Sequence, residues 1–421
     1  MTGCTIFALS SGQPPAGIAV VRVSGPEAGH VITAMTGRDL TPRHATYTAF
    51  VDPQTGETLD DGLALWFPGP GTATGEDLAE LHLHGGRAVV AAVLACLAVQ
   101  PGFRPALAGE FTRRAFENGR IDLAQAEGLA DLLAAETESQ RQSALTLAEG
   151  ALGTKVALWR AAILRASAQV EAALDFSDED DVGQTPDSVA ISVLAGEISV
   201  MLGNPPAERL RDGVRVVLAG PPNSGKSSLF NELAGRHAAI VTDIAGTTRD
   251  RIEAPVVLDG VPLLLIDTAG LRDDATDRVE AIGIALTGEA VAGADIVLWL
   301  GEGGDLPEGA LHLASKSDMG GAAPGLPVSV VTGEGLDDLR TELLARARQL
   351  LPKPGALALN ARHRGVLKIV EAELSAARTA QDLLIRAEHL RAARQGLDAI
   401  TGQAGVEDML DALFGGFCIG K

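Results

Sequence analysis

The chain has 421 residues, too many for one ordinary hydrophobic core, so several domains are expected. Its formal net charge of −21 argues against general binding to nucleic-acid phosphates, and its single Tyr and three Trp argue against aromatic platforms for single strands. Three distant cysteines without a C-x-x-C pair indicate neither a disulfide framework nor a structural zinc site. No apolar run is long enough to cross a membrane, so a soluble cytoplasmic protein is expected.

The expected elements change character along the chain. Residues 1–118 alternate short apolar runs with Gly and Pro turns, which predicts an α+β head. Residues 119–210 show helical periodicity, interrupted by the acidic stretch Asp175 to Asp181, which predicts a turn between helices. In residues 211–353, apolar runs alternate with helical segments, which predicts a mostly parallel α/β sheet. The last of these apolar runs is Pro327 to Val331. The helical pattern returns over residues 354–421, so we expect one all-α domain split by the inserted α/β unit.

A phosphate-binding loop opens the α/β unit. Residues 220–227, GPPNSGKS, fit G-x-x-x-x-G-K-[ST], in which backbone N–H groups surround phosphates, Lys226 neutralises them and Ser227 ligates Mg²⁺. The loop follows a predicted strand and precedes a predicted helix, as its mechanism requires. Its predicted nucleotide-binding residues are Asn223, Ser224, Gly225, Lys226, Ser227 and Ser228.

Two further segments follow in the order found in GTPases. Gly246-Thr247-Thr248 is a switch-type loop in which Thr248 can ligate Mg²⁺ and sense the γ-phosphate. Asp267-Thr268-Ala269-Gly270 ends an apolar strand, which places Asp267 behind the metal and the Gly270 amide at the γ-phosphate. The order and spacing predict a P-loop GTPase domain of the Ras-like class.

Base recognition is predicted at Ser315-Lys316-Ser317-Asp318, where GTPases usually carry Asn-Lys-x-Asp. Asp318 can accept two N–H donors from guanine, whereas Ser315 replaces the Asn that braces the loop, which predicts weaker nucleotide binding. Leu271 stands where many GTPases place the Gln that orients the attacking water. Glu280 is a candidate for that role, although the residues alone favour a solvated carboxylate at a helix start.

The chain ends in Phe417-Cys418-Ile419-Gly420-Lys421, which has the form of a short mobile but apolar tail. Two interpretations of Cys418 remain open from the residues alone: a reactive thiol of low pKa beside Lys421, or a cysteine that is merely buried.

The chain resembles the MnmE (TrmE) family of tRNA modification GTPases nearly from end to end. The resemblance rests on Gly109 to Thr112, Arg120 to Glu127, Gly246 to Asp250 and the ending Cys418 to Lys421. It implies a multidomain homodimer: an α+β head (1–118) that binds tetrahydrofolate and dimerises, a split all-α domain (119–210 and 354–421), and an inserted α/β P-loop GTPase domain (211–353).

The resemblance also implies the chemistry. Family members act with an FAD-dependent partner, MnmG, in a heterotetramer or larger complex, and build an aminomethyl or carboxymethylaminomethyl group at C5 of the wobble uridine of certain tRNAs. The one-carbon unit comes from a 5,10-methylene- or 5-formyl-tetrahydrofolate. By matching motifs, the folate would contact Arg22, Glu80, Arg120 and Lys421, with Cys418 near its reactive carbon. Without the resemblance, the charged residues would be assigned to surface ion pairs.

A K⁺ ion accounts for the missing Gln within the resemblance. It would be held by Asn223 and by a loop that supplies Thr242, Ile244 and Thr247, while Glu280 positions the water and Mg²⁺ is held by Ser227 and Thr248. The resemblance implies that further residues bind the nucleotide. Those of the K⁺ loop are Thr242, Asp243, Ile244, Ala245, Gly246, Thr247 and Thr248, and those of the later motifs are Asp267, Thr268, Ala269, Gly270, Lys316 and Asp318.

Two alternative functions remain open. A regulatory GTPase of ribosome assembly would use the same GTPase domain as a switch without group transfer, but the acidic chain and the folate-type head do not favour it. A folate-dependent aminomethyltransferase acting on a protein would account for the head but would not explain the presence of the GTPase domain.

Overall fold

The computed structural model describes residues 3–175, 188–237, 253–268, 291–301, 306–320, 324–403 and 407–420. The chain separates into two compact units, Met1–Ala130 with Asp398–Lys421, and Asp131–Leu397. Of the expected acidic turn, only Asp175 is described, at the end of a helix. Among the described helices, none has the length and apolar character needed to span a membrane.

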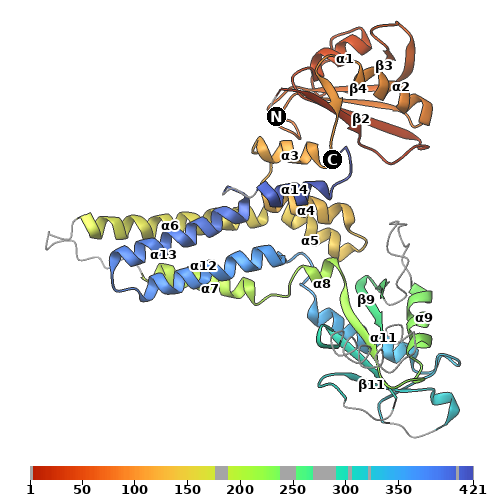
Figure 1. The fold of residues 1–421 in the computed structure, drawn as a ribbon, viewed down its shortest axis with the longest axis vertical. Coiled ribbons are helices and arrows are strands. Elements are labelled where there is room, and N and C mark those ends of the chain that lie inside the picture. Colours follow the sequence, from red (N-terminus) through yellow and green to blue (C-terminus); the bar gives the residue numbers. More distant parts are fainter. Residues whose placement is uncertain are drawn as a thin grey trace, which may run out of the picture. The chain divides into compact units, whose positions relative to one another are not determined.

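Six strands form the sheet of the first unit, in the order β3-β4-β5-β2-β1-β6. Neighbouring strands are antiparallel except β1 and β6. Alternate residues of β2, such as Val21 and Val23, pack in a core with α1 and α2, which cover one face (Figure 1). Because side chains alternate along a strand, Arg22 and its cross-strand neighbour Glu80 lie on the opposite face. The bounds are β1 (Thr5–Leu9), β2 (Ile18–Ser24), α1 (Ala28–Thr36), β3 (Thr46–Val51), β4 (Thr58–Phe67), β5 (Leu78–His84), α2 (Arg87–Ala98) and β6 (Phe103–Pro105).

Two helices from opposite ends of the chain complete this unit: α3 (Glu110–Glu117) and α14 (Glu407–Gly415) contact each other. The ring of Phe414 lies 6.2 Å from those of Phe116 and Phe417, and the cluster also includes Ala126 of α4 (Leu123–Ala134). The C-terminal residues of this unit therefore share a core with α3 and α4.

The helical part of the second unit is built from segments on both sides of the GTPase-type insertion. Its helices are α5 (Glu138–Ala148), α6 (Ala151–Asp175), α7 (Ser188–Leu202), α12 (Ala361–Thr379) and α13 (Leu383–Thr401). Helix α7 packs against α12 and α6 (Figure 1), which confirms the prediction of a split all-α domain. Buried residues recur on α6 at helical spacing, from Val156 through Trp159 and Ile163 to Val170, and supply one side of this packing.

A second sheet, in the order β12-β11-β10-β7-β9-β8, forms the α/β part of this unit. All neighbouring pairs are parallel except β8 and β9, which form a hairpin at Asp259 and Gly260, both with positive φ (47° and 76°). The predicted run Pro327 to Val331 is strand only to Val328, because Ser329 N–H bonds Glu334 O and closes a turn. The bounds are β7 (Val214–Ala219), α9 (Lys226–His237), β8 (Glu253–Leu258), β9 (Val261–Asp267), β10 (Ile296–Leu300), β11 (Leu311–Ser315), β12 (Leu326–Val328) and α11 (Leu336–Leu350).

A one-turn helix, α8 (Glu208–Arg211), leads into β7 and is held from both sides. Gln140 Nε2 donates to the carbonyls of Leu210 and Arg211 (2.9 and 3.3 Å), while Arg209 Nε lies 2.7 Å from Asp295 Oδ1 at the start of β10. Gln140 also completes the capping box of α5 with Thr137. The entry to the α/β part is therefore anchored to α5 by side-chain hydrogen bonds.

Candidate functional site

The loop between β7 and α9 has the backbone geometry of a phosphate-binding turn. Gly220 (φ 140°) passes so close to β10 that a Cβ there would lie 2.2 Å from the Leu300 carbonyl oxygen. Asn223 (φ 59°) and Gly225 (φ 96°) are also left-handed. Lys226 Nζ donates back to the carbonyls of Gly220 and Pro221 (3.1 and 2.8 Å). The loop is thereby held closed at the start of α9, where helix N–H groups favour anions.

The end of β9 lies beside this loop. Asp267 is the register partner of Leu218 on β7 and is 5% exposed, and Thr268 Oγ1 donates to the Leu218 carbonyl (2.8 Å). The exposed Ser227 occupies the first turn of α9. The structure thus brings the predicted metal-site residues Ser227 and Asp267 to the same edge of the sheet.

The base-recognition segment follows β11 directly and is tied to two other loops. Asp318 Oδ1 accepts a hydrogen bond from Ser329 Oγ (2.6 Å), and Ser329 is fully buried. Ser315 Oγ donates to the Ser224 carbonyl (2.7 Å), and Lys316 Nζ donates to the Asn223 carbonyl (2.8 Å). Although Ser315 stands where GTPases usually carry Asn, its hydroxyl still connects the base-recognition segment to the P-loop.

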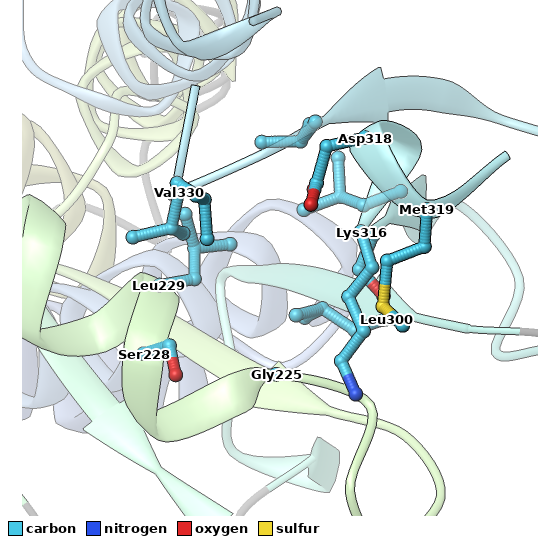
Figure 2. Close-up of a pocket in the computed structure, with 12 residues that line it drawn as sticks. Gly225, Ser228, Leu229, Leu300, Lys316, Asp318, Met319 and Val330 are labelled. Atoms are coloured by element: carbon cyan, nitrogen blue, oxygen red, sulfur yellow. The ribbon is translucent and has the colours of Figure 1, made fainter. Parts of the chain in front are cut away.

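These segments enclose a cavity of about 170 Å³. Figure 2 shows the Asp318 carboxylate on one side, Ser228 of α9 on the other and Lys316 extending toward Gly225. The mostly apolar wall suits a flat base, and the carboxylate suits its N–H donors. The lining residues are Gly225, Ser228, Leu229, Leu300, Leu313, Ser315, Lys316, Asp318, Met319, Val328, Val330 and Val331. Sequence motifs identified Gly225, Ser228, Lys316 and Asp318 of this cavity. They did not identify its apolar lining residues, because only the fold brings those residues together.

Several predicted site residues lie outside the described residues. They are Thr242, Asp243, Ile244, Ala245, Gly246, Thr247, Thr248, Ala269, Gly270, Leu271, Glu280 and Lys421.

The predicted folate residues lie on the head. Arg22 Nη2 is 2.8 Å from Glu80 Oε1, and the Arg22 guanidinium carbon lies 5.9 Å from the centre of the Phe111 ring. His82 Nε2 lies 3.3 Å from the other Glu80 oxygen. Arg120, in the turn between α3 and α4, donates through Nε to the Thr72 carbonyl (3.0 Å). Arg22 and Glu80 thus form a charge pair on the face that α1 and α2 leave uncovered.

A buried charge network that the sequence analysis did not predict fastens α3 to the sheet. Glu110 accepts from Arg104 and Arg114, and Arg114 also lies 2.8 Å from Glu76 Oε2. Burial alone would raise the pKa of Glu110, but hydrogen bonds from Arg104, the Leu107 N–H and Arg114 outweigh it and lower the pKa.

The C-terminal segment is docked on the head, which corrects the expectation of a mobile tail. Ile419 forms an antiparallel bridge with Ala108, and Ser10 Oγ donates to the Gly420 carbonyl (2.8 Å). Gly420 has φ 98°, and a Cβ there would lie 2.1 Å from the Leu9 carbonyl oxygen. Phe417 is buried, whereas Cys418 is exposed, which excludes the interpretation of a merely buried cysteine.

This docking places the segment close to the Arg22 strand. Leu9 of β1 is the register partner of Val21, the residue before Arg22, and Ser10 N–H donates to the Val20 carbonyl (2.7 Å). Gly420, which packs against Leu9 and Ser10, therefore lies near the strand that carries Arg22.

Comparison with known proteins gives consistent results over the whole chain. Residues 5–120 match the family described as "GTP-binding protein TrmE N-terminus", and residues 123–418 match the "MnmE helical domain". The tRNA modification GTPase MnmE of Rhizorhabdus wittichii is 58% identical over 99% of this chain and 96% of its own length. That of Novosphingobium aromaticivorans is 54% identical over 99% of both chains. The crystal structure of the G domain of the T. maritima FeoB iron transporter is 25% identical over 32% of this chain and 98% of its own, with a TM-score of 0.24.

Proposed function

The chain belongs to the MnmE family of tRNA modification GTPases, and from this membership we propose that it uses GTP hydrolysis to drive modification of the wobble uridine of certain tRNAs. An aminomethyl or carboxymethylaminomethyl group would be added at C5 from a folate one-carbon unit, together with an FAD-dependent, MnmG-type partner. One observation carries the proposal: the segment with the exposed Cys418 is bonded to the head near the strand of Arg22.

The proposed GTP step relies on positioning and on neutralising charge. Guanine would occupy the cavity beside Asp318, and the phosphates would lie along the P-loop, where Lys226 Nζ is held by the carbonyls of Gly220 and Pro221. Ser227, exposed in the first turn of α9, fits a hydroxyl ligand for Mg²⁺ together with Thr248, with Asp267 behind it. The exposed Asn223, with its left-handed backbone, fits a K⁺ ligand together with Thr242, Ile244 and Thr247, and Glu280 orients the water. Mg²⁺ and K⁺ held by these residues would supply fixed positive charge beside the phosphate oxygens on which negative charge develops.

The proposed folate site uses the face of the head sheet opposite α1 and α2, beside Phe111 of α3. The Glu80 carboxylate can accept the N–H groups of a pterin ring, and Arg22, Arg120 and Lys421 can bind the carboxylates of the glutamate tail. A 5,10-methylene- or 5-formyl-tetrahydrofolate bound there would present its one-carbon unit toward Cys418. Support comes from the Arg22–Glu80 pair, which already holds two of these groups together on the same face.

We also propose a homodimer formed through the head (1–118), with a split helical domain (119–210 and 354–421) and the GTPase domain (211–353) between its halves. Exposed apolar side chains on the head sheet support such an interface, among them Ile18 and the cross-strand pair Tyr47 and Leu63. The substrate tRNA and the three unpaired cysteines are consistent with action in the cytoplasm.

The alternative function is a regulatory GTPase of ribosome assembly, which would not explain why the C-terminal segment with Cys418 is docked on the head. The two proposals differ in what deletion of the gene does to tRNA. We expect mass spectrometry of nucleosides to show that the modified wobble uridine disappears and returns when the gene is restored. An unchanged nucleoside profile combined with accumulation of ribosome precursors would instead support the alternative.

A further inference from the structure

Two arginines of the head donate to neighbouring carbonyls of one loop. The loop comprises residues 68–77, between β4 and β5. Arg43 Nη2 donates to the Gly71 carbonyl (2.6 Å), and Arg120 Nε donates to the Thr72 carbonyl (3.0 Å). Because the Cα atoms of adjacent residues lie only about 3.8 Å apart, both guanidinium groups are fixed at the same part of the loop. Arg120 is one of the proposed folate residues, whereas Arg43 is not.

The loop is held by hydrogen bonds of its own. The Thr72 hydroxyl donates to the Glu76 carbonyl (2.5 Å), and the hydroxyls of Thr74 and Ser24 share a hydrogen bond (2.7 Å). From the turn after α3, Asn118 Nδ2 donates to the Thr74 carbonyl (2.8 Å). Both threonines are buried. The two arginines therefore bond to carbonyls whose positions are fixed.

Arg43 is itself held in one orientation. Its φ is 61°, a left-handed conformation that is uncommon for a residue with a Cβ, and its backbone N–H donates to the Trp66 carbonyl (2.8 Å). Its guanidinium carbon lies 5.8 Å from the centre of the Phe67 ring. Within the described residues only Gly71 accepts a hydrogen bond from this exposed side chain. Most of the five N–H donors of the guanidinium thus remain available to a ligand.

Neither Arg43 nor Arg120 has a carboxylate partner among the residues that the structure describes. This is notable in a chain with 55 Asp and Glu against 34 Lys and Arg. Arg114 of the same unit, by contrast, pairs with both Glu76 and Glu110. Two fixed guanidinium groups without internal carboxylates can accept the carboxylates of a ligand, and little side-chain entropy is lost when they do.

We propose that Arg43 forms a second carboxylate subsite, which binds a γ-linked glutamate beyond the first glutamate of the folate tail. The inference rests on the proposed folate site, in which Arg120 binds a carboxylate of the first glutamate. The next glutamate then reaches the neighbouring guanidinium of Arg43, which can bind its carboxylate through two parallel N–H groups. The favoured ligand is therefore a tetrahydrofolate with a polyglutamate tail.

A phosphate of the substrate tRNA is the other anion that an exposed guanidinium can bind. The folate tail is favoured by continuity, because the loop of residues 68–77 extends the β4–β5 hairpin that carries Glu80, and Arg120 contacts the same loop. The net charge of −21 also disfavours general attraction of tRNA. The test must distinguish these two ligands.

The test measures, by isothermal titration calorimetry, the affinities of the full-length protein for 5-formyltetrahydrofolate and for its triglutamate. Arg43→Gln removes the charge, and Arg43→Lys, which keeps it, is the conservative variant. Arg87→Gln is the matched control. Arg87 is also exposed and also donates to one loop carbonyl, that of Pro14 (3.4 Å), but it lies at the other end of β5.

We expect the wild type to bind the triglutamate about tenfold more tightly than the monoglutamate. In Arg43→Gln this preference should fall to about twofold, while the affinity for the monoglutamate changes by less than about twofold. Arg43→Lys should keep part of the preference, and Arg87→Gln should keep all of it. The preference of the wild type should decrease as KCl is added, because salt screens exposed charges.

The outcomes separate the inference from the proposed function. Equal affinities of the wild type for the two folates would overturn the inference and leave the folate site intact. Equal weakening of both folates by Arg43→Gln would show that Arg43 only stabilises the loop. An unchanged preference in Arg43→Gln combined with weaker tRNA binding would assign Arg43 to a phosphate instead. If the wild type binds neither folate, the proposed folate site itself fails.

Discussion

Glu110 shows how one residue can hold a helix against a sheet. Its carboxylate accepts from the side chains of Arg104 and Arg114 and from the Leu107 N–H (2.9 Å), and its side chain is only 10% exposed. A carboxylate at such a position is stable only while its partners are in place, because an unpaired buried charge is strongly unfavourable. If Glu110 is replaced, the buried Arg114 keeps its pair with Glu76, whereas Arg104 loses its carboxylate partner at a side chain that is 32% exposed.

Replacing Glu110 with Gln is therefore expected to destabilise the head by about 3 kcal/mol at pH 7. The pKa of Glu110 is lowered by folding, so its contribution is present above the unfolded pKa of about 4.3 and is lost as the pH falls through the lowered value. Glu110→Gln should thus reduce stability at pH 7 and make it less sensitive to acid below about pH 4.3.

Urea titrations, read by pulsed hydrogen exchange of peptides from β2 and β5, measure this stability at each pH. Glu117→Gln is the matched control, because Glu117 pairs with Arg113 on the exposed side of the same helix (side chain 53% exposed). Its expected effect is below about 1 kcal/mol. Equal effects of the two substitutions would show that the buried network has no special role.

Residues that act through short motifs could be predicted from the sequence, whereas residues that act through tertiary contacts could not. Lys226 and Asp318 stand at fixed spacing in motifs, and the structure places them at the P-loop and the base cavity. Ser329, which bonds Asp318, and Glu110 carry no such spacing signal, because their partners are brought together by the fold. For Ser315, the sequence showed the missing Asn but not the bond to Ser224 that the shorter side chain makes.

At the scale of elements, the C-terminal segment is the part whose position differs most from expectation. Periodicity predicted both sheets and the split helical domain, because each strand and helix has its own local pattern. A five-residue segment has none, so its docking depends on single contacts such as the Ile419–Ala108 bridge and the Ser10–Gly420 hydrogen bond. Gly420 also needs φ 98°, which a residue with a Cβ rarely adopts.

Gly420→Ala should therefore release the segment, since its Cβ would clash with the Leu9 carbonyl and the backbone would resist the left-handed conformation. We expect GTP hydrolysis to be unchanged, while tRNA modification falls about tenfold or more as Cys418 leaves its position. Gly415→Ala is the control, because it lies at the end of α14 with open space around it.

Hydrogen exchange of the C-terminal peptide checks the cause. Faster exchange in Gly420→Ala, but not in Gly415→Ala, is the expected result. Undiminished tRNA modification by a Gly420→Ala protein with a released segment would mean that docking is not required for the chemistry.

At the scale of the whole molecule, two chemistries are assigned to separate parts of one chain. The GTPase elements lie within Asp131–Leu397, and the head with the C-terminal segment forms the other unit. At the insertion point, identified side chains fasten the GTPase part to the helical part, Gln140 among them. A net charge of −21 makes tRNA capture by simple electrostatic attraction unfavourable, as expected if the proposed partner protein contributes to tRNA binding.

The most direct test of this division measures two activities of one protein, Cys418→Ser, reconstituted with the FAD-dependent partner, tetrahydrofolate, GTP and tRNA. Because Cys418 belongs to the unit that lacks the nucleotide site, we predict GTP hydrolysis within about twofold of wild type and no detectable modified wobble uridine. Lys226→Ala, the comparison variant, should lose both activities. Wild-type levels of modified uridine made by Cys418→Ser would contradict the assignment of the C-terminal segment to the chemistry.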